Sequence, residues 1–503
     1  MADFVSNKVY VGRREILTDA EEITEANVLE ELTNALVVHR ENRNEIQYLW
    51  NYYRGFQDVQ FKEKLVRPEI NEKITVNRAN EIVSFKVGYL TGEPITYISK
   101  SDEEKVRDAV NKLNDAMYAL GKSSEDRELM LWDMVCGTAY RFISTEKVDD
   151  VPFKIYTLDP RNSFVVYSSN IRRTPMFSVS SYMKAGNTIK APMVGANQYQ
   201  AEVYEIYTAN MYFRIEDGVI VEATPHTLGM IPVIEYPANK ERQGAFEIVL
   251  PLLNALNSLY SNRLDSVEAF VQAFLKFVNC DIDEEGLKLL KEYGAIKIKS
   301  EPNMPADVEL VANEMNQGDT QTFVDAIDAQ INVICGLPNR NGGLSTSDTG
   351  RATELRDGWV NAETKAKDSE MAYKKADKDT LRVVFKICSD TGYLSLKLSD
   401  VDSKFTRRNY DNMQSKSQVL IAMLQNNKIH PKLAFTSCGM FTDPEEAYQV
   451  SMEYYDEQQE KLLEQQATPA PADGNSSQRS AKNADTDTKE ISNPILKSAS
   501  QTN

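Results

Sequence analysis

The chain has 503 residues, of which 42% are hydrophobic and 9% aromatic, and this ordinary globular composition excludes a protein that is disordered throughout. Its formal net charge of -18 argues against a protein that grips nucleic acid by neutralising phosphates, because that mode of binding needs a basic face. The sequence has neither a charged-then-apolar leader nor an apolar run long enough to cross a bilayer, so we expect synthesis in a cytosol and no membrane partner.

Residues 1–75 are mostly polar and helical in pattern, and the aromatic run from Tyr48 to Phe56 is their main apolar anchor. A helix is predicted next, ended by Gly92 and followed by an extended exit through Pro94. Its apolar residues recur at helical spacing, at Val83, Val87 and Leu90. The same spacing predicts a second helix, with Val106, Val110, Leu113 and Met117. From about Phe142 to Tyr236, short Val, Ile, Tyr and Phe runs alternate with Asp-Pro and Asp-Gly pairs, which predicts β-sheet with tight turns.

Two long amphipathic helices separated by an insertion are predicted in the middle of the chain. The first carries a sustained apolar stripe, at Val249, Leu253, Leu256, Tyr260, Leu264, Val267, Val271 and Phe274. Unbroken from Leu252 to Val278, it would form a rod of roughly 40 Å at about 1.5 Å per residue. The insertion, residues 279–318, contains two short predicted strands, "AIKIKS" and "DVELVAN". The second helix ends at Gly336 and places on one side Phe323, Ile327, Ile331 and Ile334.

The longest amphipathic pattern runs from Leu355 to Ile387, and Gly358 within it is expected to weaken or bend the helix at a cost of about 1 kcal/mol against Ala. Apolar stripes this wide are more than one thin domain covers, so self-association is favoured. Two further helices are predicted, one through Val419 to Leu424 and one that starts at Asp443 with a capping box. From about Gln465 onward the composition predicts a disordered tail.

The segment "GLPNRNGGLSTSDTGRATELR", residues 336–356, places Gly342 and Gly343 between two predicted helices. Glycine-rich loops that open a helix bind phosphate through backbone N–H groups and the helix dipole. A nucleotide site is not favoured here, because Gly343 is not followed by Lys and Ser or Thr, and no strand precedes the loop. The remaining alternatives are a flexible connector, or a mobile loop that two rigid helices present to a polyanion.

Other candidate chemistry is weak. Asp281 to Glu292 has the acid spacing of an EF-hand, but Lys288 stands where an apolar residue normally pairs the loops, so an acid-capped helix is favoured over a calcium site. Three histidines lie far apart without ligand spacing, at His39, His226 and His430. Five cysteines, also far apart, predict free thiols, at Cys136, Cys280, Cys335, Cys388 and Cys438. We therefore expect no metal, no cofactor and no enzyme.

Several segments, read in chain order, resemble the portal proteins of tailed bacteriophages, of the type found in siphophages of Gram-positive hosts. Together with the helix-insertion-helix block 246–337, they are "NRANEIVSFKVGYLTGEPITY", "LDPRNSFVVYSSNIRRTPMFSVSSY", "GMIPVIEYPANKERQGAFE", "GGLSTSDTG", "KFTRRNYDN" and "FTDPEEAYQVSMEYYDEQQE". The resemblance runs in register over roughly residues 45–460. It implies an α+β, mainly helical portal-like fold with a β-rich wing segment, and a ring, usually of twelve subunits, at one capsid vertex.

The resemblance also implies how the chain is divided. The parts are the N-terminal region and wing (1–245), the first stem helix (246–278), a small α/β clip (279–318), the second stem helix (319–338), the tunnel loop (339–350), the long wing helix and following strand (351–409), the crown (410–460) and a disordered tail (461–503). The tunnel loop would face DNA through Arg340, Asn341, Gly342, Gly343, Leu344, Ser345, Thr346, Ser347, Asp348 and Arg351. Neighbouring stems would meet through Leu256, Tyr260, Leu264, Phe323 and Ile327.

By the same resemblance, double-stranded DNA passes through the ring without sequence specificity during packaging and ejection. The clip would bind the terminase large subunit and afterwards a head-completion or adaptor protein, and the ring would contact scaffolding and major capsid proteins. Assembly in the host cytoplasm would place it in the virion. An acidic ring suits this role, because it repels the duplex and lets it slide. The alternatives are a helical structural or scaffold oligomer without DNA passage and, more distantly, a nucleotide-dependent enzyme.

Overall fold

The computed structural model describes the chain as helices and strands that form two compact units, Met1–Gln418 and Val419–Asn503. The described residues are 12–65, 68–101, 103–184, 202–271, 274–278, 307–311, 317–338, 358–407, 413–441 and 444–467. Helix and sheet are mixed, in agreement with the predicted α+β class. All the described strands belong to the first unit.

A six-stranded sheet forms the β-rich part of the first unit. Its strands, in spatial order, are β1 (Ile16–Thr18), β5 (Ser163–Ser168), β6 (Pro175–Met183), β7 (Glu202–Tyr207), β8 (Met211–Glu216) and β9 (Val219–Pro225). β1 pairs parallel with β5, and the other neighbours pair antiparallel. Asp217 and Gly218 both have positive φ in the β8–β9 hairpin, as a tight two-residue turn requires. Residues 1–75 were predicted to be mostly helical in pattern, and the strand β1 within them was missed, because three residues are too few to show alternation.

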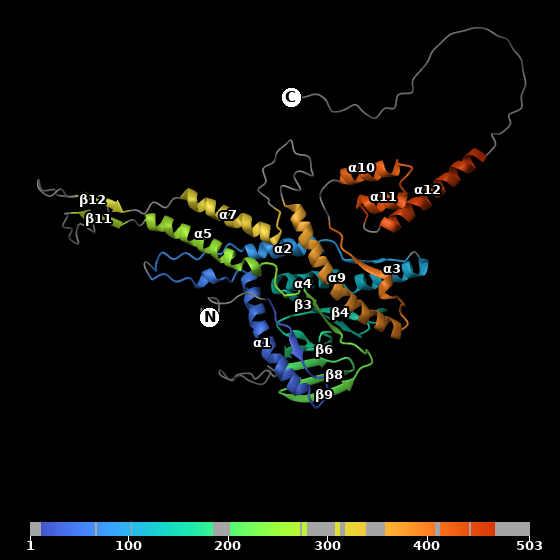
Figure 1. The fold of residues 1–503 in the computed structure, drawn as a ribbon, viewed down its shortest axis with the longest axis horizontal. Coiled ribbons are helices and arrows are strands. Elements are labelled where there is room, and N and C mark those ends of the chain that lie inside the picture. Colours follow the sequence, from blue (N-terminus) through green and yellow to red (C-terminus); the bar gives the residue numbers. More distant parts are fainter. Residues whose placement is uncertain are drawn as a thin grey trace, which may run out of the picture. The chain divides into compact units, whose positions relative to one another are not determined.

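The helix α1 (Val28–Tyr53) contributes to two of three hydrophobic cores in this unit. Its first half packs Val28 and Leu32 against the six-stranded sheet. Its second half packs Leu49 and Tyr52 among helices that follow in the chain. Figure 1 shows α1 leading from the sheet to those helices. The sheet and the helical part of the unit are therefore joined by one continuous helix.

The helices predicted over residues 83–90 and 106–117 are confirmed. They are α2 (Arg78–Thr91) and α3 (Glu104–Ala119). The Asn77 side chain caps α2 by accepting a hydrogen bond from the backbone N–H of Asn80, and Gly92 follows the last turn as predicted. The extended exit forms β2 (Thr96–Ser99), which pairs antiparallel with β13 (Val401–Lys404).

A smaller antiparallel sheet has the order β10, β3, β4. Its strands are β10 (Val233–Pro237), β3 (Thr138–Ser144) and β4 (Lys154–Leu158). The helix α4 (Lys122–Cys136) packs against β3 and β4. Gly137, at φ +78, ends α4 and begins the turn into β3, where a side chain would collide with the backbone of Arg242.

The two predicted central helices are α5 (Leu250–Val271), which follows the short turn η3 (Glu247–Val249), and α7 (Gln317–Cys335). They lie side by side (Figure 1). The prediction of one helix through Val278 was wrong, because Phe274–Val278 forms the strand β11. β11 pairs antiparallel with β12 (Asp307–Val311), which confirms the strand predicted in "DVELVAN". "AIKIKS" and the acidic stretch from Asp281 lie outside the described residues.

The long helix predicted from Leu355 to Ile387 is α9 (Trp359–Asp390), which packs against β10 and β3. The prediction that Gly358 weakens its interior was wrong, because Gly358 has φ +81 and lies at the N-cap position, outside the helix. Leu355 lies outside the described residues. The second half of α9 packs Val384 and Ile387 against α3, in the hydrophobic core to which α1 does not contribute. The turn η4 (Leu398–Asp400) then leads into β13.

Three helices close the described chain. They are α10 (Met413–Leu424), which crosses the boundary between the two units, α11 (Pro431–Cys438) and α12 (Pro444–Ala467). α10 and α12 agree with the predictions, whereas the eight-residue α11 was missed because it is too short to show a periodic stripe. Phe435 of α11 stacks on Phe441 and meets the ring of Tyr448 in α12.

α12 also corrects the start of the predicted tail, because residues 461–467 are helical. The predicted cap Asp443 and residues 468–503 lie outside the described residues.

Candidate functional site

The predicted contacts between neighbouring stems divide into buried and exposed residues. Leu256 and Ile327 are 1% and 8% exposed and belong to the subunit's own core, so they are corrected from contact residues to core residues. Tyr260 is partly buried against the same core. Leu264 and Phe323 are 37% and 63% exposed. The apolar stripe of α5 is therefore covered by the chain itself at its start and open towards its end.

A polar stripe on another face of α5 binds a segment that we call the strap, residues 57–77 without 66 and 67. Asn257 Oδ1 accepts a hydrogen bond from the Val76 backbone N–H at 2.8 Å. Ser261 Oγ accepts from the Ile74 N–H at 3.0 Å, and Asp265 Oδ1 accepts from the Glu72 N–H at 2.7 Å. The three acceptors recur every four residues and so lie on one face of the helix. Their donors alternate along an extended chain, whose two-residue repeat of roughly 6.6 Å approximates one helical step of four residues, roughly 6 Å.

Charged and amide side chains hold the other part of the strap on α5. Lys62 and Lys64 place their ammonium groups 2.9 and 2.5 Å from Asp265 Oδ2. Burial alone would raise the pKa of the Asp265 carboxyl, but Lys64 and Lys62 hold this pKa below its ordinary value. Asn257 Nδ2 also donates to Gln57 Oε1 at 2.6 Å. The sequence analysis missed the strap, although Asn, Ser and Asp at four-residue spacing on an apolar helix signal buried groups that need partners.

The described residues on either side of the predicted tunnel loop lie next to each other. α7 ends at Gly336, which has φ +70, and the Asn361 side chain in α9 donates to the Val333 carbonyl of α7 at 3.0 Å. A side-chain carbon on Gly358 would lie 3.6 Å from the Leu337 carbonyl oxygen. The predicted DNA-facing residues, from Arg340 to Arg351, lie outside the described residues, and their role stays a prediction.

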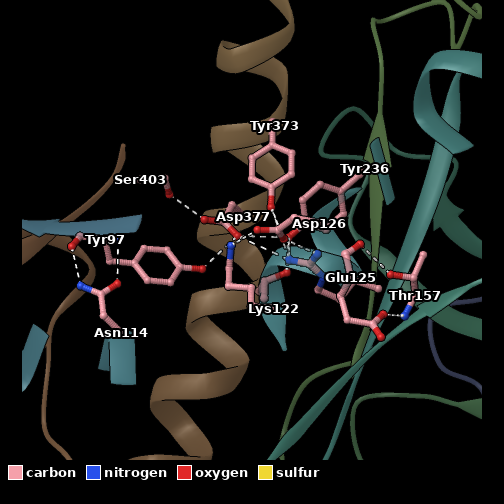
Figure 2. A network of polar contacts seen from close by, with 12 residues as sticks. Tyr97, Asn114, Lys122, Glu125, Asp126, Thr157, Tyr236, Tyr373, Asp377 and Ser403 are labelled. Carbon is pink, nitrogen blue, oxygen red and sulfur yellow. Dashed lines mark hydrogen bonds and ion pairs between the residues drawn. The ribbon is translucent and has the colours of Figure 1, made fainter. Parts of the chain in front are cut away.

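Figure 2 shows a buried polar network that joins α4, β3 and α9. At its centre, Arg141 Nη2 donates to Asp126 Oδ1 at 2.6 Å, and Lys122 pairs with the other oxygen of Asp126. The second carboxylate, Asp377, accepts from Ser403 Oγ at 2.6 Å. Tyrosine hydroxyls complete the network, from Tyr97, Tyr236 and Tyr373.

This network is charge-balanced and closed to solvent. Its four charged residues are at most 3% exposed, namely Lys122, Asp126, Arg141 and Asp377. Burial alone would raise the pKa of the Asp126 carboxyl, but Lys122 and Arg141 hold this pKa below its ordinary value. These groups lie inside the core, where they connect elements of the fold.

The described residues meet neither the requirements of a metal site nor those of a membrane-spanning helix. No group of three or more His, Cys, Asp or Glu side chains there is placed to hold a metal ion. No described helix is long and apolar enough to span a membrane. His39 and His226 each contact a separate backbone carbonyl, and His430 caps α11. The described cysteines are buried free thiols, as predicted, and Cys280 lies outside the described residues.

Comparison with known proteins decides the family. A family model described as phage portal protein, SPP1 Gp6-like, matches residues 36–472. The chain belongs to this family of phage portal proteins. The portal protein of Bacillus phage SPP1 is 23% identical over 326 residues, a match that covers 57% of this chain and 61% of that relative. The portal family was thus predicted correctly from the sequence, and the family match includes the strap, both central helices and the helices α10 to α12.

Proposed function

We propose that this portal-family chain forms a ring at one capsid vertex, which is the channel for DNA packaging and ejection. The observation that carries the proposal is the family match, which runs from within α1 to beyond the end of α12. Such a ring, with twelve subunits as the expected number, would be assembled in the host cytoplasm and reside in the virion.

Within this proposal, α5 and α7 are the stem and the segment between them is the clip. The pairing of β11 with β12 supports a clip that begins at Phe274, earlier than residue 279. The clip would dock the terminase large subunit during packaging and a head-completion or adaptor protein afterwards. The outer parts would contact scaffolding and major capsid proteins during assembly.

The ring itself is tested by negative-stain electron microscopy and light scattering of the purified full chain. We expect closed rings with a central hole and one defined mass. Rods, open filaments or monomers would instead favour the alternative, a helical structural oligomer without DNA passage.

The tunnel loop is tested with the double variant Gly342→Val, Gly343→Val. Only glycine reaches positive φ without strain, so two valines should stiffen a loop that must rearrange as the duplex slides past. We expect normal rings and capsids but less nuclease-protected DNA per capsid. Wild-type packaging would show that the loop is a plain connector. Specific ATP binding by the purified ring, lost in the variant, would reopen the nucleotide-site alternative.

A further inference from the structure

The two sides of the stem carry different exposed apolar surfaces, and this inference rests on the proposed ring. A closed ring repeats one heterologous contact, in which a surface on one side of each subunit meets a different surface on the next. Two such surfaces must be complementary and must lie at the same height along the ring axis. The described part of the stem meets both requirements.

The strap and α7 lie on opposite sides of α5. The strap is bound by Ser261 and Asp265. Arg263 lies two residues from both, and so roughly 160° away around the helix. Its Nη1 donates to Gln321 Oε1 of α7 at 2.7 Å. The order across the subunit is therefore strap, α5, α7.

The free side of α7 exposes two large apolar side chains. Phe323 lies two residues from Gln321, and so points roughly 160° away from the contact with α5. Ile334 follows eleven residues later, about three full turns, on the same flank. Phe323 and Ile334 are 63% and 36% exposed. Neither belongs to a core of the subunit.

The free side of the strap is also apolar. Phe61 is about half exposed, and its ring meets edge to face that of Phe56, the half-exposed residue just before the strap, with centroids 5.1 Å apart. Leu65 is fully exposed. The hydrogen bonds and ion pairs to α5 hold the strap, and with it this apolar surface, in a fixed position on the helix.

Phe61 and Leu65 of the strap lie at the same level along α5 as Phe323 of α7. Lys62 and Lys64, the neighbours of Phe61 and Leu65, contact Asp265. Gln321, the neighbour of Phe323, contacts Arg263, two residues away from Asp265. Rotation about a ring axis along the stem would therefore bring one surface opposite the other without a shift in height.

We infer that the strap of one subunit packs with Phe61 and Leu65 against Phe323 of α7 in the next subunit. The occupant of each surface is a second copy of this chain. Burying side chains of this size would remove from water apolar area worth roughly 25 cal/mol per Å² at each contact. The contact is repeated around the ring. Because it joins two different surfaces, it would also fix the direction in which the subunits follow one another.

Cysteine cross-linking of assembled rings tests this contact directly. Phe61→Cys and Phe323→Cys are combined with Cys280→Ser, and the rings are oxidised or treated with a short bis-maleimide that bridges pairs too distant for a disulfide. On a non-reducing denaturing gel we expect a ladder of covalent oligomers up to the full ring. The matched control replaces Phe61→Cys by Val37→Cys, which is 60% exposed on α1, outside the strap, and should give no ladder.

A charge exchange provides an independent measurement. Phe61→Asp and Phe323→Asp should each abolish rings while circular dichroism stays that of the wild type, and Phe61→Lys together with Phe323→Asp should restore them. Wild-type rings with neither a ladder nor a rescue would overturn the inference and leave the ring proposal standing. Absence of rings in the wild type would overturn the ring proposal itself.

Discussion

Arg141 shows how individual charges are used inside this fold. It is 0% exposed, contacts Asp126 directly and lies 3.9 Å from Asp377. Removing one partner of such a buried group typically costs about 3–5 kcal/mol, because the remaining charge stays uncompensated. The network thus makes the packing of α4, β3 and α9 sensitive to single substitutions, although it adds no chemistry.

His39 supplies a prediction at the scale of one residue. Its ring stacks on Phe164, its Nε2 proton is donated to the Arg161 carbonyl, and burial lowers its pKa from 6.5 to about 4. The unfolded chain then binds the proton at a higher pH than the folded chain, so stability falls as the pH drops from about 6.5 towards 4. Between pH 7 and pH 5 we expect His39 to account for a loss of about 2 kcal/mol.

The measurement is chemical denaturation at both pH values for the wild type and His39→Gln, with His430→Gln on the exposed cap of α11 as the control. The variant His39→Gln should show a smaller pH-dependent loss than the wild type. An identical loss in both would contradict a neutral, buried imidazole at this position.

At the scale of elements, the strap and α5 act as one structural unit. The α5 side chains accept hydrogen bonds from strap amides that have no strand partner of their own. A backbone N–H that loses such a partner opens to solvent more readily. Side chains of α5 therefore control the order of a segment roughly 190 residues earlier in the chain.

Ser261→Ala should raise the hydrogen-exchange rate of the Ile74 amide and, to a smaller degree, of Glu72 and Val76. Asp265→Asn should do the same for Glu72 and should also loosen Lys62 and Lys64, which pair with its carboxylate. Exchange measured by mass spectrometry on peptides covering residues 68–77 reports this effect. Ser258→Ala, on an exposed position of α5, is the matched control and should leave these peptides unchanged. Equal exchange in Ser261→Ala and the control would refute the strap as described.

The same elements show what a sequence can and cannot predict. α2 and α3 were predictable because each combines apolar residues at helical spacing with a terminal signal such as Gly92. The end of α5 was not, because Phe274 and the residues after it continue an apolar run that suits a strand equally well, and pairing with β12 decides between the two. The sequence of the strap does not predict its contact with α5, because α5 binds the strap through backbone N–H groups. Portal membership was predictable from the order of segments, whereas the exposure of Leu264 and Phe323 required the structure.

At the scale of the whole molecule, we expect one stripe of α5 to contribute both to folding and to assembly. Leu256→Asp should prevent folding, because it places an unpaired charge in the core. Leu264→Asp, two turns further along the same stripe, should fold with normal circular dichroism but lose rings in light scattering. This pair sharpens the test, because both variants introduce the same side chain on the same helix. Normal rings from Leu264→Asp would remove the end of α5 from the assembly surface.

The way in which α5 binds the strap determines which changes in this segment the protein tolerates. α5 binds amides at every second residue, so the exposed side chain of Lys73 between them is free of this constraint and can be replaced. Adding or deleting one residue between Glu72 and Val76 is different, because it presents carbonyl oxygens to the acceptor oxygens of Asn257 and Ser261. The segment is therefore permissive to substitution and intolerant of changes in length, and a deep mutational scan with single-residue insertions would show this as a sharp minimum in fitness confined to insertions.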